Sequence, residues 1–114
     1  MNYADLEIHQ GADIVFRLEL INDDKTAKDL TNLTARAYIK KTYATSDSDA
    51  TAFVCSFPEP RTDGYLDLTL DGTVSDDMRK GMYYYDVFLF NNDSDSEKIL
   101  EGRVDLKPSA TSII

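Results

Sequence analysis

Three features of the sequence predict an all-β fold, an antiparallel β-sandwich of about seven strands with one short helical turn. Apolar and polar residues alternate in several short segments, which is the periodicity of strands with one buried face. Clusters of Asn, Asp, Gly and Pro separate these segments at intervals of roughly eight to twelve residues. The length of 114 residues suits one hydrophobic core, so we expect a single domain over residues 1–108 and a tail over residues 109–114.

The first half of the chain contains three predicted strands. A short strand over residues 6–9 ends at a turn, and the clearest strand follows over residues 14–20. A polar turn cluster over residues 22–25 ends it, and a third strand follows over residues 33–41. The side chains expected to face the core are Ile14, Phe16, Leu18, Leu20, Leu33, Ala35, Ala37 and Ile39.

Two more strands and the helical turn are predicted in the middle of the chain. Residues 53–57 alternate as one strand, and residues 65–70 form the next strand after a turn signal at Asp63 and Gly64. Residues 73–80 favour a helix of one to two turns. In that segment we expect Ser75 to cap the N-terminus and Gly81 to supply the left-handed stop.

The last two predicted strands are an aromatic-rich strand and a strand that contains a glycine. Residues 82–90 form the most aromatic strand, and the final strand places Leu100, Val104 and Leu106 on one face. Gly102 lies between these residues, where we expect a neighbouring segment to approach closely. The spacing of Met78, Gly81, Tyr83 and Tyr85 matches a corner motif in which the Tyr83 hydroxyl bonds to the backbone just upstream. These elements together predict an immunoglobulin-like sandwich.

The charge balance argues against two classes of partner. The formal net charge is -9, with 21 acidic and 12 basic residues, and the basic residues are scattered along the chain. Nucleic-acid affinity comes mainly from clustered Lys and Arg, so we expect no nucleic acid partner. No apolar run approaches the roughly 20 residues that a membrane-spanning helix needs, so we expect no membrane partner.

Residues that could carry chemistry are few. His9 stands alone in a short strand with no nucleophile pattern beside it, and Cys55 lies in an apolar run that predicts a buried, inert thiol. The residues Asn91, Asp93, Asp95 and Glu97 resemble part of a calcium loop, but Ser96 replaces the required Gly and Gly102 the closing Glu. The sequence therefore predicts no catalytic residue, no metal site and no cofactor, and a chain that is not an enzyme.

Outward tyrosines and an apolar chain end are the candidate interaction residues. Tyr38, Tyr43, Tyr65 and Tyr84 are expected on outer faces, where tyrosine suits a sugar-stacking platform or packing against another subunit. We expect Tyr38, Tyr84 and the terminal pair Ile113 and Ile114 to make contacts with other subunits, because that pair has no place in the core.

Several motifs, in this order, resemble the small immunoglobulin-like structural proteins of tailed bacteriophages. This family includes structural proteins of T4-like and cyanobacterial phages and the N-terminal module of phage baseplate upper proteins. The matching segments are residues 10–20, 29–36, 39–41, 64–70, 81–87, 100–104 and 108–111.

The resemblance implies a non-catalytic virion protein, an adaptor or docking subunit of the tail, baseplate or neck. Its partners would be other virion proteins and copies of itself, and its location the virion, assembled in the host cytoplasm. Two alternatives stay open, a capsid decoration protein and a carbohydrate-binding module for a host surface glycan.

Overall fold

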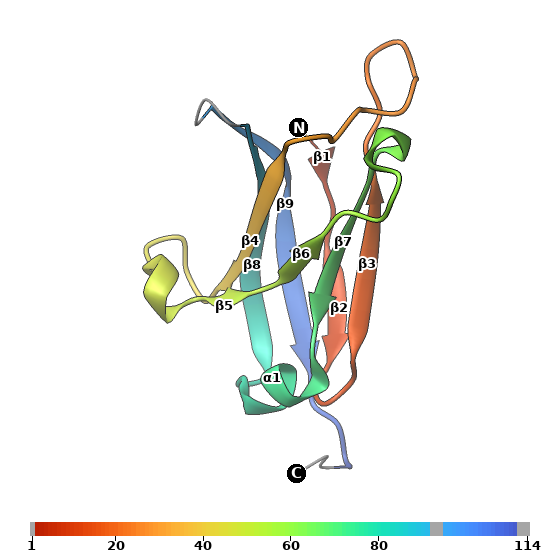
Figure 1. Ribbon diagram of the computed structural model, residues 1–114. Helices are drawn as coiled ribbons and strands as arrows, with labels where there is room; N and C mark the ends of the chain where they lie inside the picture. The colour runs from red at the N-terminus through yellow and green to blue at the C-terminus, as the bar shows by residue number, and fades with distance from the viewer. Residues whose placement is uncertain (1, 92–94, 112–114) are drawn as a thin grey trace.

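Two β-sheets packed face to face make up the computed structural model, which describes residues 2–91 and 95–111 (Figure 1). Within these residues the elements are β1 (Asn2–Tyr3), β2 (Leu6–His9), β3 (Ile14–Glu19), β4 (Thr34–Lys40), η1 (Asp47–Asp49), β5 (Thr51–Ala52), β6 (Val54–Ser56), η2 (Arg61–Asp63), β7 (Tyr65–Leu70), α1 (Gly72–Asp77), β8 (Gly81–Phe90) and β9 (Ser96–Lys107). The predicted immunoglobulin-like sandwich with one short helix is confirmed.

The larger sheet, called here the large sheet, runs in the order β1-β9-β8-β4-β5, with β2 also paired to β9. Its central pairs, β4 with β8 and β8 with β9, are antiparallel. In contrast, β1 and β2 both pair with β9 in parallel. The sequence predicted antiparallel strands throughout, and the difference arises because the first segment of the chain pairs with the last strand instead of with its neighbour β3.

The three-stranded sheet, called here the small sheet, has the order β3-β7-β6. The predicted strand over residues 53–57 is represented by β6, which pairs with β7, whereas the residues just before Phe53 form β5 and pair with β4 in the large sheet. Phe53 lies at the crossing, and its ring packs edge-on against Phe16 at 6.4 Å and Tyr85 at 6.3 Å. The alternation continues unbroken through Phe53, so the change of sheet has no counterpart in the hydrophobic pattern.

The short helix α1 begins differently from the prediction. Its N-cap is Asp71, whose side chain accepts a hydrogen bond from the Thr73 N–H at 3.0 Å. Ser75 is fully buried inside the helix, where its hydroxyl accepts from the Gly11 N–H at 3.0 Å. The helix ends at Asp77, and Gly81, with a φ of 137°, opens β8 instead of closing the helix.

The N-terminal segment is held against β9 at Gly102. A Cβ atom on Gly102 would lie 1.9 Å from the Ala4 carbonyl oxygen, so only glycine fits. That same oxygen accepts a 2.6 Å hydrogen bond from the hydroxyl of the buried Tyr85. The close approach expected at Gly102 is therefore present, and the neighbouring segment is the link between β1 and β2.

Gly102→Ala is expected to destabilise the domain by about 1–3 kcal/mol, because the added methyl group must displace the Ala4 backbone. Denaturant unfolding measures the loss. Hydrogen exchange should also show faster exchange in β1 and β2 than in β4. Glu101→Ala, one position away on the same strand, is the matched control. A Gly102→Ala protein as stable as this control would contradict the packing described here.

Ionisation of Tyr85 should weaken the fold at alkaline pH. Burial raises the pKa of Tyr85 from its ordinary 10.0 to about 12. The neutral phenol is favoured in the folded state, so its contribution to stability is complete below pH 10.0 and is lost as the pH rises to about 12.

Tyr85→Phe measures this contribution. The variant should be less stable than the original by about 1 kcal/mol near pH 8, because the bond to Ala4 is lost. The difference should shrink near pH 11. Denaturant titrations at both pH values test this, and a difference that stays constant would contradict it.

Candidate functional site

The outer face of the large sheet consists of the side chains of β4, β8 and β9 that point away from the small sheet. Four aromatic side chains on this face, flanked by charged residues, are called here the aromatic band: Tyr38, Tyr84, Phe88 and Phe90. The register places the side chains of this face in cross-strand rows with the β8 residue in the middle. The three central rows are Arg36, Phe88 and Lys98; Tyr38, Asp86 and Glu101; and Lys40, Tyr84 and Arg103. Two rows thus place an aromatic ring between two cations, and the row between them carries two acids.

The cations of this face lie on its rings. The Arg36 guanidinium is 4.9 Å from the centre of the Phe90 ring, and the Lys98 ammonium is 5.8 Å from the centre of the Phe88 ring. The two phenylalanine rings stack on each other, with their centres 6.2 Å apart. These contacts order the side chains before any partner arrives, which lowers the entropy lost on binding.

Tyr43 extends the aromatic band beyond the strands. It lies in the loop after β4, is 60% exposed, and stacks on Tyr84 with the ring centres 4.6 Å apart. Tyr38, Tyr43 and Tyr84 together line a shallow hollow of about 10 Å³. The structure therefore brings together three of the four outward tyrosines that the sequence singled out.

Asp86 is the half-buried charge at the centre of the outer face. Burial raises the pKa of its carboxyl group above the ordinary value, and the Lys98 ammonium, 4.0 Å away, offsets this only in part. A hollow of about 250 Å³ beside the carboxylate is lined by Arg36, Tyr38 and Phe88, among other residues. The carboxylate can accept a hydrogen bond from a partner there.

The remaining predicted interaction residues lie elsewhere. Tyr65 is on the small sheet, under the Arg17 guanidinium at 5.3 Å from the ring centre. The Tyr83 hydroxyl donates to the Arg79 carbonyl at 2.6 Å, which is the upstream bond that the corner motif requires. Ile113 and Ile114 lie outside the described residues.

The residues considered for chemistry are dispersed. The His9 Nε2 atom lies 3.5 Å from the Glu7 carboxylate on an exposed part of β2. Cys55 is half-buried, and burial raises the pKa of its thiol. Asn91 Oδ1 accepts from the Asp95 N–H at 3.0 Å within the β8–β9 hairpin, and Asp93 lies outside the described residues. Residues 2–91 and 95–111 contain no group of three His, Cys, Asp or Glu residues that could hold a metal ion.

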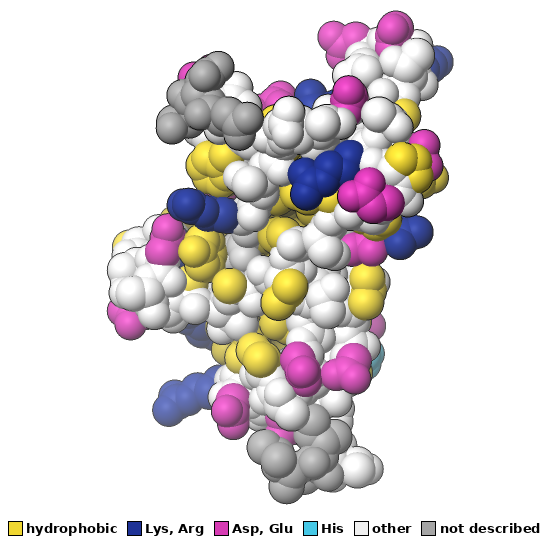
Figure 2. All heavy atoms as spheres, in the orientation of Figure 1, with side chains coloured by type: hydrophobic (Ala, Val, Ile, Leu, Met, Phe, Trp, Pro, Cys, Tyr) yellow, Lys and Arg dark blue, Asp and Glu magenta, His cyan; other side chains and the backbone are white. Residues whose placement is uncertain are grey.

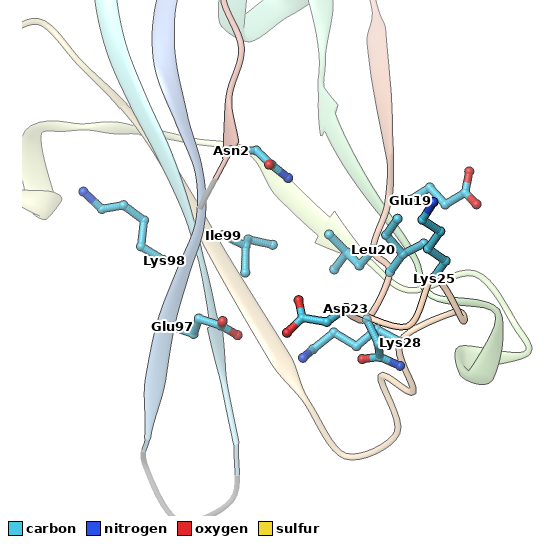
Figure 3. A pocket seen from close by; sticks show the side chains of 11 residues that line it. Asn2, Glu19, Leu20, Asp23, Lys25, Lys28, Glu97, Lys98 and Ile99 are labelled. Carbon is cyan, nitrogen blue, oxygen red and sulfur yellow. The ribbon is translucent and has the colours of Figure 1, made fainter.

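A larger hollow, of about 490 Å³, opens between the end of β3 and the start of β9 (Figure 3). Leu20 and Ile99 face each other across it, and charged side chains of both signs surround them (Figure 3). The polar groups come from four separate segments and do not converge on one reacting position. The hollow is therefore an open end of the sandwich, and it is a weaker candidate than the outer face of the large sheet.

No helix in the described part of the chain has the length and apolar character to cross a membrane. No protein-family model matches the sequence, and no curated protein matches it.

Solved structures give only remote likenesses. CopC from Methylosinus trichosporium OB3b is 13% identical, with a TM-score of 0.46, over 94% of this chain and 89% of that chain. Murine CRIg is 9% identical, with a TM-score of 0.40, over 92% of each chain. The fimbrial subunit AggA from Escherichia coli is 12% identical, with a TM-score of 0.34, over 92% of this chain and 89% of that chain. At these values none of the three informs function.

The sequence pattern did not identify three residues of the outer face as interaction residues: Asp86, Phe88 and Phe90. The signal was available, because Tyr85, Val87 and Leu89 are buried and strand alternation then turns their neighbours outward. The cross-strand partners of these residues depend on register, which the sequence did not supply.

Asp86→Asn should raise the melting temperature of the isolated domain at neutral pH. Its folded-state pKa is raised, so ionisation of Asp86 costs stability above the ordinary value of 3.8, and the cost disappears once the pH falls below it. Melting curves at about pH 7 and about pH 3 test this. Asp105→Asn, an exposed change of the same charge on β9, is the control. An Asp86→Asn protein no more stable than this control at pH 7 would contradict the desolvation of Asp86.

Proposed function

We propose that this chain is a non-catalytic docking domain that binds another protein through the outer face of the large sheet. The aromatic band on that face carries the proposal. Aromatic rings and arginine supply much of the binding energy at protein interfaces, since they bury large areas with little loss of side-chain freedom. On this face Tyr38, Tyr84, Phe88 and Phe90 lie together beside Arg36.

Charge supports the same surface. The three central rows carry four basic residues and two acidic ones, whereas the whole chain has a formal net charge of -9. These rows therefore carry a net positive charge, which Asp47 reduces through its 2.6 Å ion pair with Lys40, while the rest of the chain is acidic. An acidic partner surface would be attracted to the rows and repelled elsewhere. The basic residues of the rows are Arg36, Lys40, Lys98 and Arg103.

The sequence resemblance supports a place for this docking in a tailed bacteriophage particle. We take the domain to be an adaptor subunit of the tail, baseplate or neck, with capsid decoration as the alternative location. Its partner would then be another virion protein. Geometry favours this over a glycan-binding role, because Tyr43 stacks on the Tyr84 ring and leaves a hollow of only about 10 Å³ between the tyrosines.

Phe88→Glu is expected to abolish incorporation of the domain into particles. The new carboxylate would lie between Arg36 and Lys98, whose charges can offset it in the isolated fold. It removes the central aromatic ring and lowers the positive charge of this row from two to one, so the docking surface loses both features. Particles assembled with each variant are purified, and the domain in them is quantified by mass spectrometry. Val54→Glu, at an exposed position on the small sheet, is the matched control and should be incorporated normally.

Two results would count against separate parts of the proposal. Absence of the original chain from purified particles would refute the virion role. Normal incorporation of Phe88→Glu, with a melting temperature like that of the original, would refute this face as the docking surface.

A further inference from the structure

The strand β3 is an open edge of the small sheet. The sheet order β3-β7-β6 leaves β3 paired on one side only, and Figure 1 shows no strand beyond it on that side of the molecule. In a sandwich this position could be covered by the first strand of the chain. Here β2 pairs with β9 in the other sheet, so among residues 2–91 and 95–111 no other strand pairs with the open side of β3.

The direction of the free backbone groups follows from the bonds at the end of β3. The Leu20 N–H donates to the Gly64 carbonyl, and the Leu20 carbonyl accepts from the Lys28 N–H, both on the β7 side. Backbone groups alternate between the two sides of a strand, so those of Val15, Arg17, Glu19 and Ile21 point to the open side. A further strand can therefore form backbone hydrogen bonds with these four alternate residues.

This edge lacks two of the usual protections against strand addition, proline and a β-bulge. Residues 15–21 contain no proline, and the register of β3 with β7 is continuous, without a bulge. At the two ends of the segment Val15 is 61% exposed and Ile21 is 57% exposed. On the face that Figure 2 shows, hydrophobic side chains lie in separate spots and form no broad apolar patch.

We propose that β3 pairs antiparallel with β3 of a second copy of this chain, joining the two small sheets into one continuous sheet. The segment Val-Phe-Arg-Leu-Glu-Leu-Ile over residues 15–21 is complementary to itself when reversed. With Leu18 on the two-fold axis, Val15 lies opposite Ile21 of the second copy. Arg17 then lies opposite Glu19 of the second copy, and the two-fold axis repeats both pairs.

The pairing is favourable on both faces of the joined sheet. On the outer face the rows are an apolar pair, two ion pairs and a second apolar pair, which are the cross-strand combinations that stabilise sheets. On the inner face Phe16 meets Leu20 of the second copy and Leu18 meets its own equivalent. All three side chains are only partly buried in the single chain, so pairing extends the core across the interface.

Charge selects this register. Moving the second strand by two residues in one direction would place Arg17 opposite its own equivalent, and moving it in the other would do the same to Glu19, which like charges disfavour. Arg17 already donates to Asp67 at 2.8 and 3.0 Å, yet its side chain remains 57% exposed. Its guanidinium can therefore accommodate Glu19 of the second copy as well.

This inference goes beyond the proposed function and does not rest on it, since β3 belongs to the other sheet. A dimer built at β3 leaves the outer face of each large sheet free. It would present two docking faces to an assembly. A single short strand pair is at the low end of interface sizes, so the dimer should form in a concentration-dependent way.

Glu19→Pro tests the strand pairing. Proline at this position removes an N–H that points to the open side while leaving the bonds to β7, and the two-fold axis removes it twice. Sedimentation velocity over a concentration series should show a monomer–dimer equilibrium for the original chain. Glu19→Pro should weaken dimerisation by about tenfold or more, and Glu19→Ala, which keeps the N–H, by less. Unchanged melting of Glu19→Pro establishes that the fold is kept.

Disulfide trapping tests the register, in proteins that also carry Cys55→Ala. A mixture of Val15→Cys and Ile21→Cys proteins should cross-link under mild oxidation, because opposed residues lie within disulfide range. Either protein alone should not. Val15→Cys mixed with Val54→Cys is the control, since Val54 lies on β6, two strands from the edge. A chain that stays monomeric at every concentration, or cross-linking no greater than in the control, would overturn the proposal.

Discussion

The attachment of the N-terminal segment to β9 is the contact on which the arrangement of the two sheets depends. The hydrogen bond from the Tyr85 hydroxyl to the Ala4 carbonyl beside Gly102 contributes to it, and β1 and β2 pair with β9 in parallel on either side of this bond. The Asp5 carboxylate adds to this by accepting from the Arg103 N–H at 3.0 Å. Two consequences follow, because the large sheet gains a broad outer face while the small sheet is left with β3 unpaired on one side.

Most of the strands were predictable because burial on one face leaves a two-residue period in the sequence. The inward residues of β3, β4 and β7 follow the predicted alternation. Three features were not predictable from this period. It does not reveal which strand pairs with which, it passes unchanged through the change of sheet at Phe53, and it cannot separate Asp71 from Ser75 as the cap of α1. The first two depend on contacts between distant segments, and so does the burial of Ser75 against Gly11, which leaves Asp71 as the cap.

The candidate surface was likewise predictable only in part. Alternation alone predicted that Tyr38 and Tyr84 point outward, and the structure places both on the outer face of the large sheet. Their grouping with Phe88, and the position of Asp86 between cationic rows, depend on the register of β8 with β4 and β9. A bulge between Val87 and Phe88 resets that register and brings Lys98 beside Phe88. Such a one-residue irregularity leaves no mark in the hydrophobic period.

Hydrogen exchange of the individual β3 amides in dilute solution tests most directly whether the N-terminal segment leaves this edge free. The account predicts alternating protection, with slow exchange at Phe16 and Leu18, which bond to β7, and fast exchange at Val15, Arg17 and Glu19. Uniform protection of all five amides in the monomer would contradict it, because another part of the chain would then have to cover the edge.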